Sequence, residues 1–599
     1  MNEYIAPLKD MRFLLQDMSA LAQVKALPGY EETDAELVDA ILEEAGKFAH
    51  GVLSPLNRSG DLEGARLDAD GVRMPKGWPE AYRQFSQGGW TALSAPGAYG
   101  GQHLPQLLAA FVEEIWNGAN LAFTLSPMLI RCAQQVLELR GSEAQRQTWL
   151  PPLVSGTWTG TMALTEPHAG SDVGAIRTRA VRQADGTYRL FGQKIFITYG
   201  DHDMAENIVH LVLARIEGAP EGGKGISLFI VPKFLVHADG SLGERNDVRA
   251  ISVEHKMGIH ASPTCVMAFG EQAGATGYLV GEEHRGLENM FVMMNAARFA
   301  VGLEGVGISE RAYQRALAYA RERIQGTETG SRSPERVEII RHPDIRRMLL
   351  SMKARIEAMR ALSCTIAVAM DTAARHDDPA VRSEHLGLVE LLMPIAKGWF
   401  TENAVEITSL AIQVHGGMGF IEETGAAQHY RDARISSIYE GTTGIQANDL
   451  VGRKVARDNG AAILALAAAM GEEQARLARS GDAELIAIGQ ALQEGIDALT
   501  SAIGFIVETH DSDPRQAAAG AVPFLELFGI VAGGWQLARG ALVAAEKLPA
   551  AGADRTFYSA KIHTARFYAD HILAKAPGLS RTVRTGAAAV LAMDETFFG

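Results

Sequence analysis

The chain has 599 residues, of which 47% are hydrophobic, so it can bury a large core and intrinsic disorder is excluded. Its formal net charge of −15 disfavours nucleic acid as a general partner, because phosphate binding needs clustered Lys and Arg. Cys132, Cys265 and Cys364 are far apart and odd in number, which suits a reducing compartment and provides no metal-ligand spacing.

The first ten residues show no basic-then-apolar targeting pattern. No run of ~20 apolar residues predicts a transmembrane helix. We therefore expect a soluble, cytoplasmic protein without an integral membrane segment.

The pattern of apolar residues predicts helices first and strands second. Helical spacing from Asp34 to Gly46, and again from Leu107 to Trp116, indicates helices in residues 1–158. The period changes near Gly160, and β-rich segments bounded by glycines and charged turns predict strands at 188–198, 207–214 and 226–232.

Helices return from Leu287 and continue to about Arg457, with a polar loop expected at 325–335. Alanine-rich helical patterns follow after residue 460, and such patterns are more often a structural bundle than a partner-binding segment. The chain is thus expected to be α+β, with an N-terminal helical domain, a central β-domain, a C-terminal helical bundle and an extra helical extension. The expected boundaries are 1–158, 159–282, 283–459 and 460–599.

Four motifs carry chemistry. The first is TMALTEPHAGSDV at 161–173, where Pro167 and Gly170 end a strand and expose backbone N–H groups and small hydroxyls. The second is GQKIFITYG at 192–200. The third, QVHGGMGF at 413–420, has a glycine cluster that marks a helix end with a closely approached loop. The sequence predicts His415, within it, to be a packing residue.

The fourth motif is RDARISSIYEGTTGIQ at 431–446, which places a carboxylate, Glu440, between an aromatic and a glycine. Helix or strand propensity does not require that arrangement, and Gly441 frees the carboxylate from a regular element. In this order, the four motifs together resemble the acyl-CoA dehydrogenase family. The fourth is similar to the segment that carries the family's catalytic base.

The resemblance implies an FAD enzyme that removes hydrogens from the α and β carbons of an acyl-CoA thioester. Glu440 would be the base and the N5 atom of the flavin would take the β-hydrogen as hydride, giving the trans-2-enoyl-CoA. The implied cofactor-binding residues are Met162, Leu164, Thr165, Ser171, Phe196, Thr198, Arg323, Gln413, Gly417 and Thr442. Phe196 stands where the family usually has Trp, and Arg323 matches the family's diphosphate-binding arginine only loosely in spacing.

The implied substrate-binding residues are Ser171, Arg298, Tyr439 and Gly441. Some family members carry the base immediately before the arginine matched by Arg298, but that position is Ala297 here, so the alternative placement is excluded. The resemblance further implies a homodimer, because Gln413 and Gly417 would meet the adenosine end of FAD in a second subunit. It also implies electron-transfer flavoprotein as the acceptor.

The substrate stays open at this point. Long family members with a C-terminal extension include enzymes acting on 3-methylmercaptopropionyl-CoA and enzymes acting on fatty acyl-CoAs. Two alternative functions also remain. An acyl-CoA oxidase would use the same base and flavin with oxygen as acceptor, and an alkylation-response type flavoprotein associated with nucleic acid would be expected to carry a basic stripe in its C-terminal block.

Overall fold

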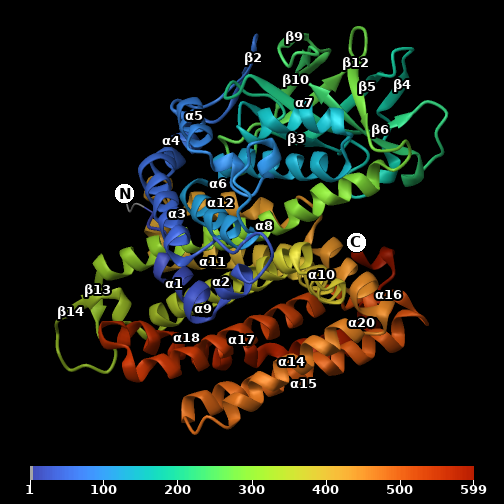
Figure 1. The fold of residues 1–599 in the computed structure, drawn as a ribbon. Helices are drawn as coiled ribbons and strands as arrows, with labels where there is room; N and C mark the ends of the chain where they lie inside the picture. The colour runs from blue at the N-terminus through green and yellow to red at the C-terminus, as the bar shows by residue number, and fades with distance from the viewer. Residues whose placement is uncertain (1–3) are drawn as a thin grey trace. The chain divides into compact units, whose positions relative to one another are not determined.

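The computed structural model describes residues 4–599, so Met1 to Glu3 of the N-terminal pattern lie outside the described residues. By compactness the chain divides into two units whose segments alternate along the sequence (Figure 1). Unit 1 comprises Met1–Ala45, Gln106–Gly118 and Val301–Gly599, and unit 2 comprises Gly46–Pro105 and Ala119–Ala300. The expected order of helices, then strands, then helices is confirmed.

Unit 2 is built on one eight-stranded sheet in the order β10-β11-β5-β12-β7-β6-β3. The strands are β3 (Trp158–Ala163), β4 (Arg179–Arg182), β5 (Tyr188–Thr198), β6 (Asn207–Ile216), β7 (Ile226–Pro232), β10 (Val248–Val253), β11 (Thr264–Phe269) and β12 (Ala275–Val280). β4 pairs with both β5 and β6, so β5, β12, β7, β6 and β4 close into a ring. These five strands have no free edge, whereas β10 and β3 are the edge strands of the sheet.

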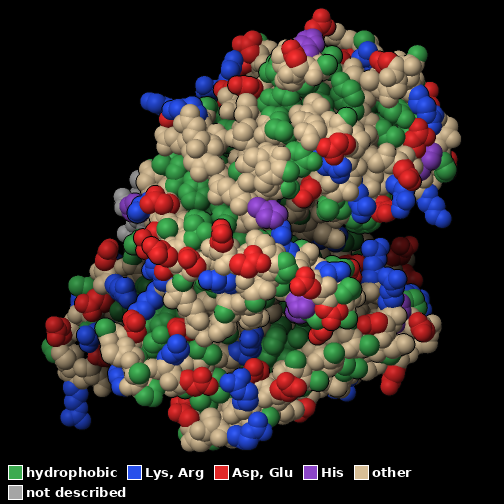
Figure 2. All heavy atoms as spheres, in the orientation of Figure 1, with side chains coloured by type: hydrophobic (Ala, Val, Ile, Leu, Met, Phe, Trp, Pro, Cys, Tyr) green, Lys and Arg blue, Asp and Glu red, His purple; other side chains and the backbone are tan. Residues whose placement is uncertain are grey.

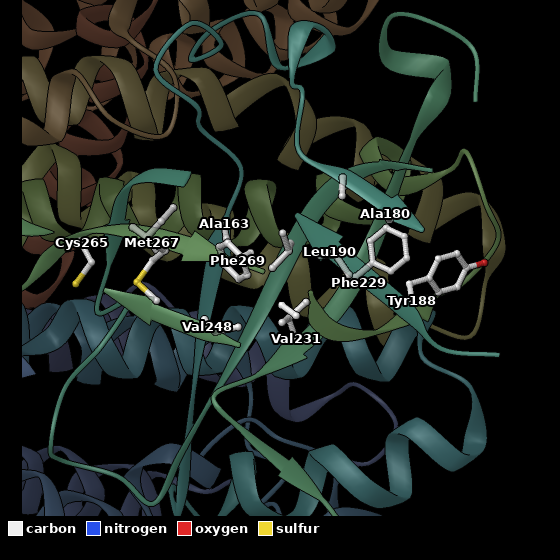
Figure 3. Close-up of a cluster of buried hydrophobic side chains, with 14 of the residues drawn as sticks. Ala163, Ala180, Tyr188, Leu190, Phe229, Val231, Val248, Cys265, Met267 and Phe269 are labelled. Atoms are coloured by element: carbon white, nitrogen blue, oxygen red, sulfur yellow. The ribbon is translucent and has the colours of Figure 1, made fainter. Parts of the chain in front are cut away.

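Buried hydrophobic side chains from several strands form the core of this sheet. Leu190 of β5, Phe229 and Val231 of β7 and Phe269 of β11 belong to one buried cluster (Figure 3). The ring of Tyr188 packs against that of Phe229 with 4.9 Å between centroids. Burial of each large side chain contributes roughly 1.5–3 kcal/mol, so the cluster provides a rigid support for the loops at the strand ends.

The α-helices of unit 2 are α4 (Ser54–Glu63), α5 (Trp78–Gln87), α7 (Glu143–Val154), the second part of α6 (Gln106–Arg140) and the first part of α8 (Gly286–Glu322). The helix α6 has non-helical backbone angles at Asn120. The amide of Asn120 donates to the carbonyl of Leu53 and accepts from the N–H of Phe123, which satisfies polar groups at the irregularity.

Unit 1 is helical. Its elements before the extension are α1 (Leu8–Arg12), α2 (Ala20–Lys25), α3 (Ala35–Phe48), the later part of α8 (Gly286–Glu322), α9 (Pro343–Arg375), α10 (Pro379–Pro394), α11 (Phe400–His415), α12 (Ala426–Ala433) and α13 (Thr443–Asp449). The strands β13 (Ile324–Thr327) and β14 (Arg336–Glu338) form a hairpin, so the loop expected at 325–335 is only partly irregular.

The extension after residue 460 forms the helices α14 (Ala461–Ala478), α15 (Ala483–His510), α16 (Pro514–Ala519), α17 (Ala521–Lys547), α18 (Arg555–His571), α19 (Ala576–Thr585) and α20 (Ala587–Leu591). The long helices α14, α15, α17 and α18 lie side by side, and α17 and α18 also pack on α9 (Figure 1). The extension is therefore part of the helical unit.

A buried ionic network joins helices distant in sequence. The guanidinium of Arg360 on α9 contacts the carboxylates of Asp10, Glu114 at 2.6 Å and Glu310 at 2.7 Å. Lys561 of the extension also contacts Asp10. Such a network costs desolvation to form, and removing one partner leaves the others buried and uncompensated.

Among residues 4–599, two helices are long and apolar enough to cross a membrane by length and composition alone, Gly286–Glu322 and Ala521–Ala550. Their most apolar windows are 67% and 83% buried inside the structure, as in core helices of globular proteins. They are weak evidence for a membrane span.

Candidate functional site

The segment that carries Glu440 joins the short 3₁₀ helix Arg434–Ser437 to α13. Its backbone is unusual, because Glu440 has φ +55° and Gly441 has φ +89°. A non-glycine residue in the left-handed region persists only where the surroundings over-determine it, and such residues cluster at functional sites. Glu440 is half-buried.

The following helix holds this backbone from its C-terminal side. Thr442 is the N-cap of α13, and its hydroxyl accepts from the N–H of Ile445. The buried amide of Gln446 donates to the carbonyls of Glu440 at 3.2 Å and Gly441 at 3.3 Å. These bonds make the loop at Glu440 a rigid support for its carboxylate.

Tyr439, which precedes Glu440, is held by a buried residue of another helix. The hydroxyl of Tyr439 donates to the carboxylate of Glu304 on α8, which is 1% exposed. Burial raises the pKa of Glu304 to about 8, and the charges of Glu113 and Glu440 act in the same direction. Sequence reasoning missed Glu304, because it lies 135 positions from Tyr439.

The glycine motif ends α11. Gln413 and Gly417 are both exposed, and an added Cβ at Gly417 would have no heavy atom within 4 Å, so this surface is open to a ligand. His415 is buried, stacks on Tyr319 with 4.5 Å between ring centroids and bonds the Ala411 carbonyl, which confirms its packing role.

Arg323 directly follows α8 and is exposed at the start of the β13–β14 hairpin. Its carbonyl accepts from the N–H of Ile339, which fixes the backbone there. Its guanidinium lies 3.5 Å from the side-chain oxygen of Gln325.

In unit 2, the loop after β3 is anchored by a buried ion pair that sequence reasoning did not use. The carboxylate of Glu166 lies 2.9 Å from the ammonium of Lys194, and it also accepts from the N–H groups of Arg177 and Thr178. Lys194 further donates to the carbonyl of Leu164 at 2.8 Å. The Glu of the first motif and the Lys of the second therefore bind the two predicted flavin segments to one another.

The pKa values of both members of this buried pair are lowered. Desolvation lowers the pKa of Lys194 to about 8, although Glu166 favours the charged form. Burial alone would raise the pKa of the Glu166 carboxyl, but Lys194 and the hydroxyl of Thr178 lower it below its ordinary value. The pair is therefore ionised at neutral pH.

The expected flavin residues of unit 2 gather at this junction. The N–H of Ile195 donates to the carbonyl of Thr165 at 2.9 Å, which sets Thr165 beside the part of β5 that carries Phe196. The pairing of β11 with β5 is irregular there, and Phe196, with φ +58°, is 59% exposed. Thr198 is half-buried two residues on.

The remaining predicted residues lie on the same two segments. Met162 is a buried residue of β3, Leu164 is half-buried, and Ser171 is exposed in the loop that follows. An exposed aromatic at a strand irregularity, beside small hydroxyls and the backbone of a loop, fits the planar, polar-edged ring of a flavin. Arg298 lies on α8 within unit 2, half-buried, and its guanidinium donates to Asn295 at 3.2 Å.

Four family models match the chain in order. Their descriptions are acyl-CoA dehydrogenase N-terminal domain at residues 36–157, middle domain at 161–271 and C-terminal domain at 284–455, followed by acetyl-CoA dehydrogenase C-terminal like at 464–594.

Curated relatives match over nearly the whole chain. A 3-methylmercaptopropionyl-CoA dehydrogenase of Ruegeria pomeroyi is 49% identical, covering 95% of this chain and 96% of the relative. The broad-specificity linear acyl-CoA dehydrogenase FadE5 of Mycobacterium tuberculosis is 35% identical over 100% of both chains. Among solved structures, an acyl-CoA dehydrogenase of Bacillus anthracis complexed with FAD shares the fold, with a TM-score of 0.74 and 21% identity over 96% of this chain and 91% of that chain.

Proposed function

Since the chain belongs to the acyl-CoA dehydrogenase family and is an FAD-dependent oxidoreductase, we propose that its substrate is 3-methylmercaptopropionyl-CoA and its base is Glu440. The reaction is the α,β-dehydrogenation of an acyl-CoA thioester. The observation that supports the base assignment is the left-handed backbone at Glu440, held by Gln446 on one side and by Tyr439 on the other. Nearly half of all positions match the Ruegeria pomeroyi relative, which favours its substrate.

The chain's own groups would act as follows. Glu440 takes the α-proton, and its backbone N–H, exposed to the substrate by the turn at Gly441, bonds the thioester oxygen, where negative charge develops. FAD, when bound, supplies the oxidising chemistry by accepting the β-hydrogen with its electron pair. Arg298 and Ser171 would bind the CoA portion.

Two sets of residues would hold the cofactor. The set in unit 2 is Met162, Leu164, Thr165, Ser171, Phe196 and Thr198. The set in unit 1 is Thr442 with Arg323, Gln413 and Gly417, the last three provided to the FAD of a second subunit. A homodimer therefore completes the site, and a stable FAD-loaded monomer in light scattering would contradict this assembly.

The test of the base is Glu440→Gln in the full-length protein, with the exposed Glu472→Gln as a control that removes the same charge from α14. Glu440→Gln should keep FAD and lose roughly 10²–10⁴-fold or more in turnover, the contribution of a general base. Activity within a few-fold of wild type would exclude Glu440 from this role.

The test of the substrate compares kcat/KM for 3-methylmercaptopropionyl-CoA with that for linear acyl-CoAs of increasing length, using an artificial electron acceptor. A maximum at the thioether supports the proposal. A broad maximum over linear chains favours the second candidate, a fatty acyl-CoA dehydrogenase, which is supported by the 35% identical FadE5 relative.

Electron-transfer flavoprotein is the proposed acceptor and the cytoplasm the proposed location. Oxygen consumption without another acceptor would instead identify an oxidase. Nucleic-acid association is disfavoured, because Lys and Arg alternate with Asp and Glu over the face in Figure 2 and form no continuous stripe there.

A further inference from the structure

Glu304 occupies a crowded part of α8, where two glycines flank it and a third follows nearby. A Cβ added to Gly302 would lie 2.7 Å from the carbonyl oxygen of Ala396. One added to Gly305 would lie 3.1 Å from the carbonyl oxygen of Phe400. At Gly307 it would lie 2.7 Å from the carbonyl of Glu114 on α6. These glycines bring α8 against two neighbouring segments, and Glu304 is buried between them.

Titratable side chains from each neighbouring element face Glu304. Glu113 comes from α6, Lys397 from the segment Ile395–Trp399, and Tyr439 and Glu440 from the base segment. All of these residues belong to unit 1. The proposed mechanism has so far used only Glu440 among them.

Within residues 4–599 the carboxyl group of Glu304 makes a hydrogen bond with a single donor. One carboxylate oxygen accepts from the Tyr439 hydroxyl, and the other has no hydrogen-bond partner within residues 4–599. A buried acid costs free energy that an apolar side chain of similar size would avoid. The hydrogen bond that compensates part of this cost joins Glu304 to Tyr439, the residue next to the proposed base.

We propose that Glu304 is a positioning residue for Glu440, acting through the hydroxyl of Tyr439. The Glu304–Tyr439 bond holds the base segment before Glu440, as the Gln446 amide holds it after. With one of the two anchors removed, the left-handed backbone at Glu440 relaxes and its carboxylate leaves the position from which it takes the α-proton. This inference rests on the proposed role of Glu440.

The size of the effect follows from the need for precise geometry. A displacement of about 1 Å at a reacting group costs up to ~10²-fold in rate. Glu304→Leu and Tyr439→Phe should each lower kcat ~10–100-fold while KM changes much less, because both keep the aromatic ring at position 439 and remove only the hydrogen bond behind it. Since both changes remove the same hydrogen bond, the double variant should be no slower than the slower single variant.

Glu304→Gln separates the hydrogen bond from the charge. Its amide oxygen still accepts from Tyr439, so it should lose less activity than Glu304→Leu. It cannot ionise, whereas Glu304 with its pKa of about 8 gains a charge beside Glu440 as the pH rises. The wild-type rate of flavin reduction should therefore show a break near pH 8 that Glu304→Gln lacks, which a purely structural role would not produce.

The matched control is Glu310→Gln, which removes a buried carboxylate from the same helix where its partner is Arg360. It should leave the pH profile of flavin reduction unchanged. All variants are assayed as FAD-loaded full-length protein.

An unchanged kcat in Tyr439→Phe, or a pH profile of Glu304→Gln that matches that of the wild type, would overturn the inference even if Glu304→Leu does not fold. Multiplicative losses in the double variant would overturn it as well. A wild type that oxidises no acyl-CoA would refute the proposed function instead. If the wild type is active and Glu440→Gln is inactive, the results of the Glu304 and Tyr439 variants test the Glu304 inference alone.

Discussion

Glu166→Gln should destabilise unit 2 and loosen its flavin segments. The carboxylate accepts from Lys194 Nζ at 2.9 Å, from Arg177 N at 2.7 Å and from Thr178 N at 2.9 Å. Lys194 has a side-chain exposure of 0%, so the substitution leaves an ammonium in the core without its counter-charge, and it replaces one of the two accepting oxygens with an NH₂ group. Removing one partner of a buried pair costs about 3–5 kcal/mol, and we expect a loss in this range.

The loss of unfolding free energy in Glu166→Gln should depend on pH. The pKa of Lys194 is lowered from 10.5 to about 8 in the folded protein, so its contribution to stability is present above pH 10.5 and is lost as the pH falls through about 8. Without Glu166 the folded pKa falls further, and the uncompensated charge disappears at a lower pH. The difference in unfolding free energy between wild type and variant should therefore be larger at pH 6 than at pH 9.

The assay is denaturant unfolding at both pH values, together with the fraction of FAD retained after gel filtration. Glu283→Gln is the control, because its partner Arg182 is largely exposed and surface pairs contribute little. A Glu166→Gln protein as stable as Glu283→Gln at pH 6, or a deficit that grows toward pH 9, would refute the reasoning.

Three further changes have distinct expected results. Gly441→Ala forces a side chain into φ +89° and 2.8 Å from the Gln446 amide, so kcat should fall ~10-fold with FAD retained, and a wild-type kcat would contradict the account of the loop. Arg360→Met should cost about 3–5 kcal/mol of unfolding free energy, more at pH 8 than at pH 5, because its freed carboxylates take up protons as the pH falls. Equal losses at both pH values would argue against that network. Thr198→Ala should shift the flavin absorbance or its reduction rate, measured by stopped flow, and identical spectra and rates would remove Thr198 from the flavin contacts.

The sequence by itself predicted the helical, β and helical order, because periods of 3.6 and 2 are local properties of the chain. The expected strand at 188–198 is β5, and the helix expected from Leu287 begins at Gly286. Glu440 could also be proposed from sequence, since the residues that mark it are its immediate neighbours.

Only the tertiary structure decided which distant residues support that segment. Glu304 reads as one acid in an apolar helix, and its role depends on glycines that bring α8 against α6 and on a tyrosine 135 positions later. Lys194 likewise reads as an ordinary polar residue of a strand until β5 is placed beside the loop of Glu166. Burial, which gives such pairs their energy and their shifted pKa values, is a property of packing between segments that local sequence patterns do not encode.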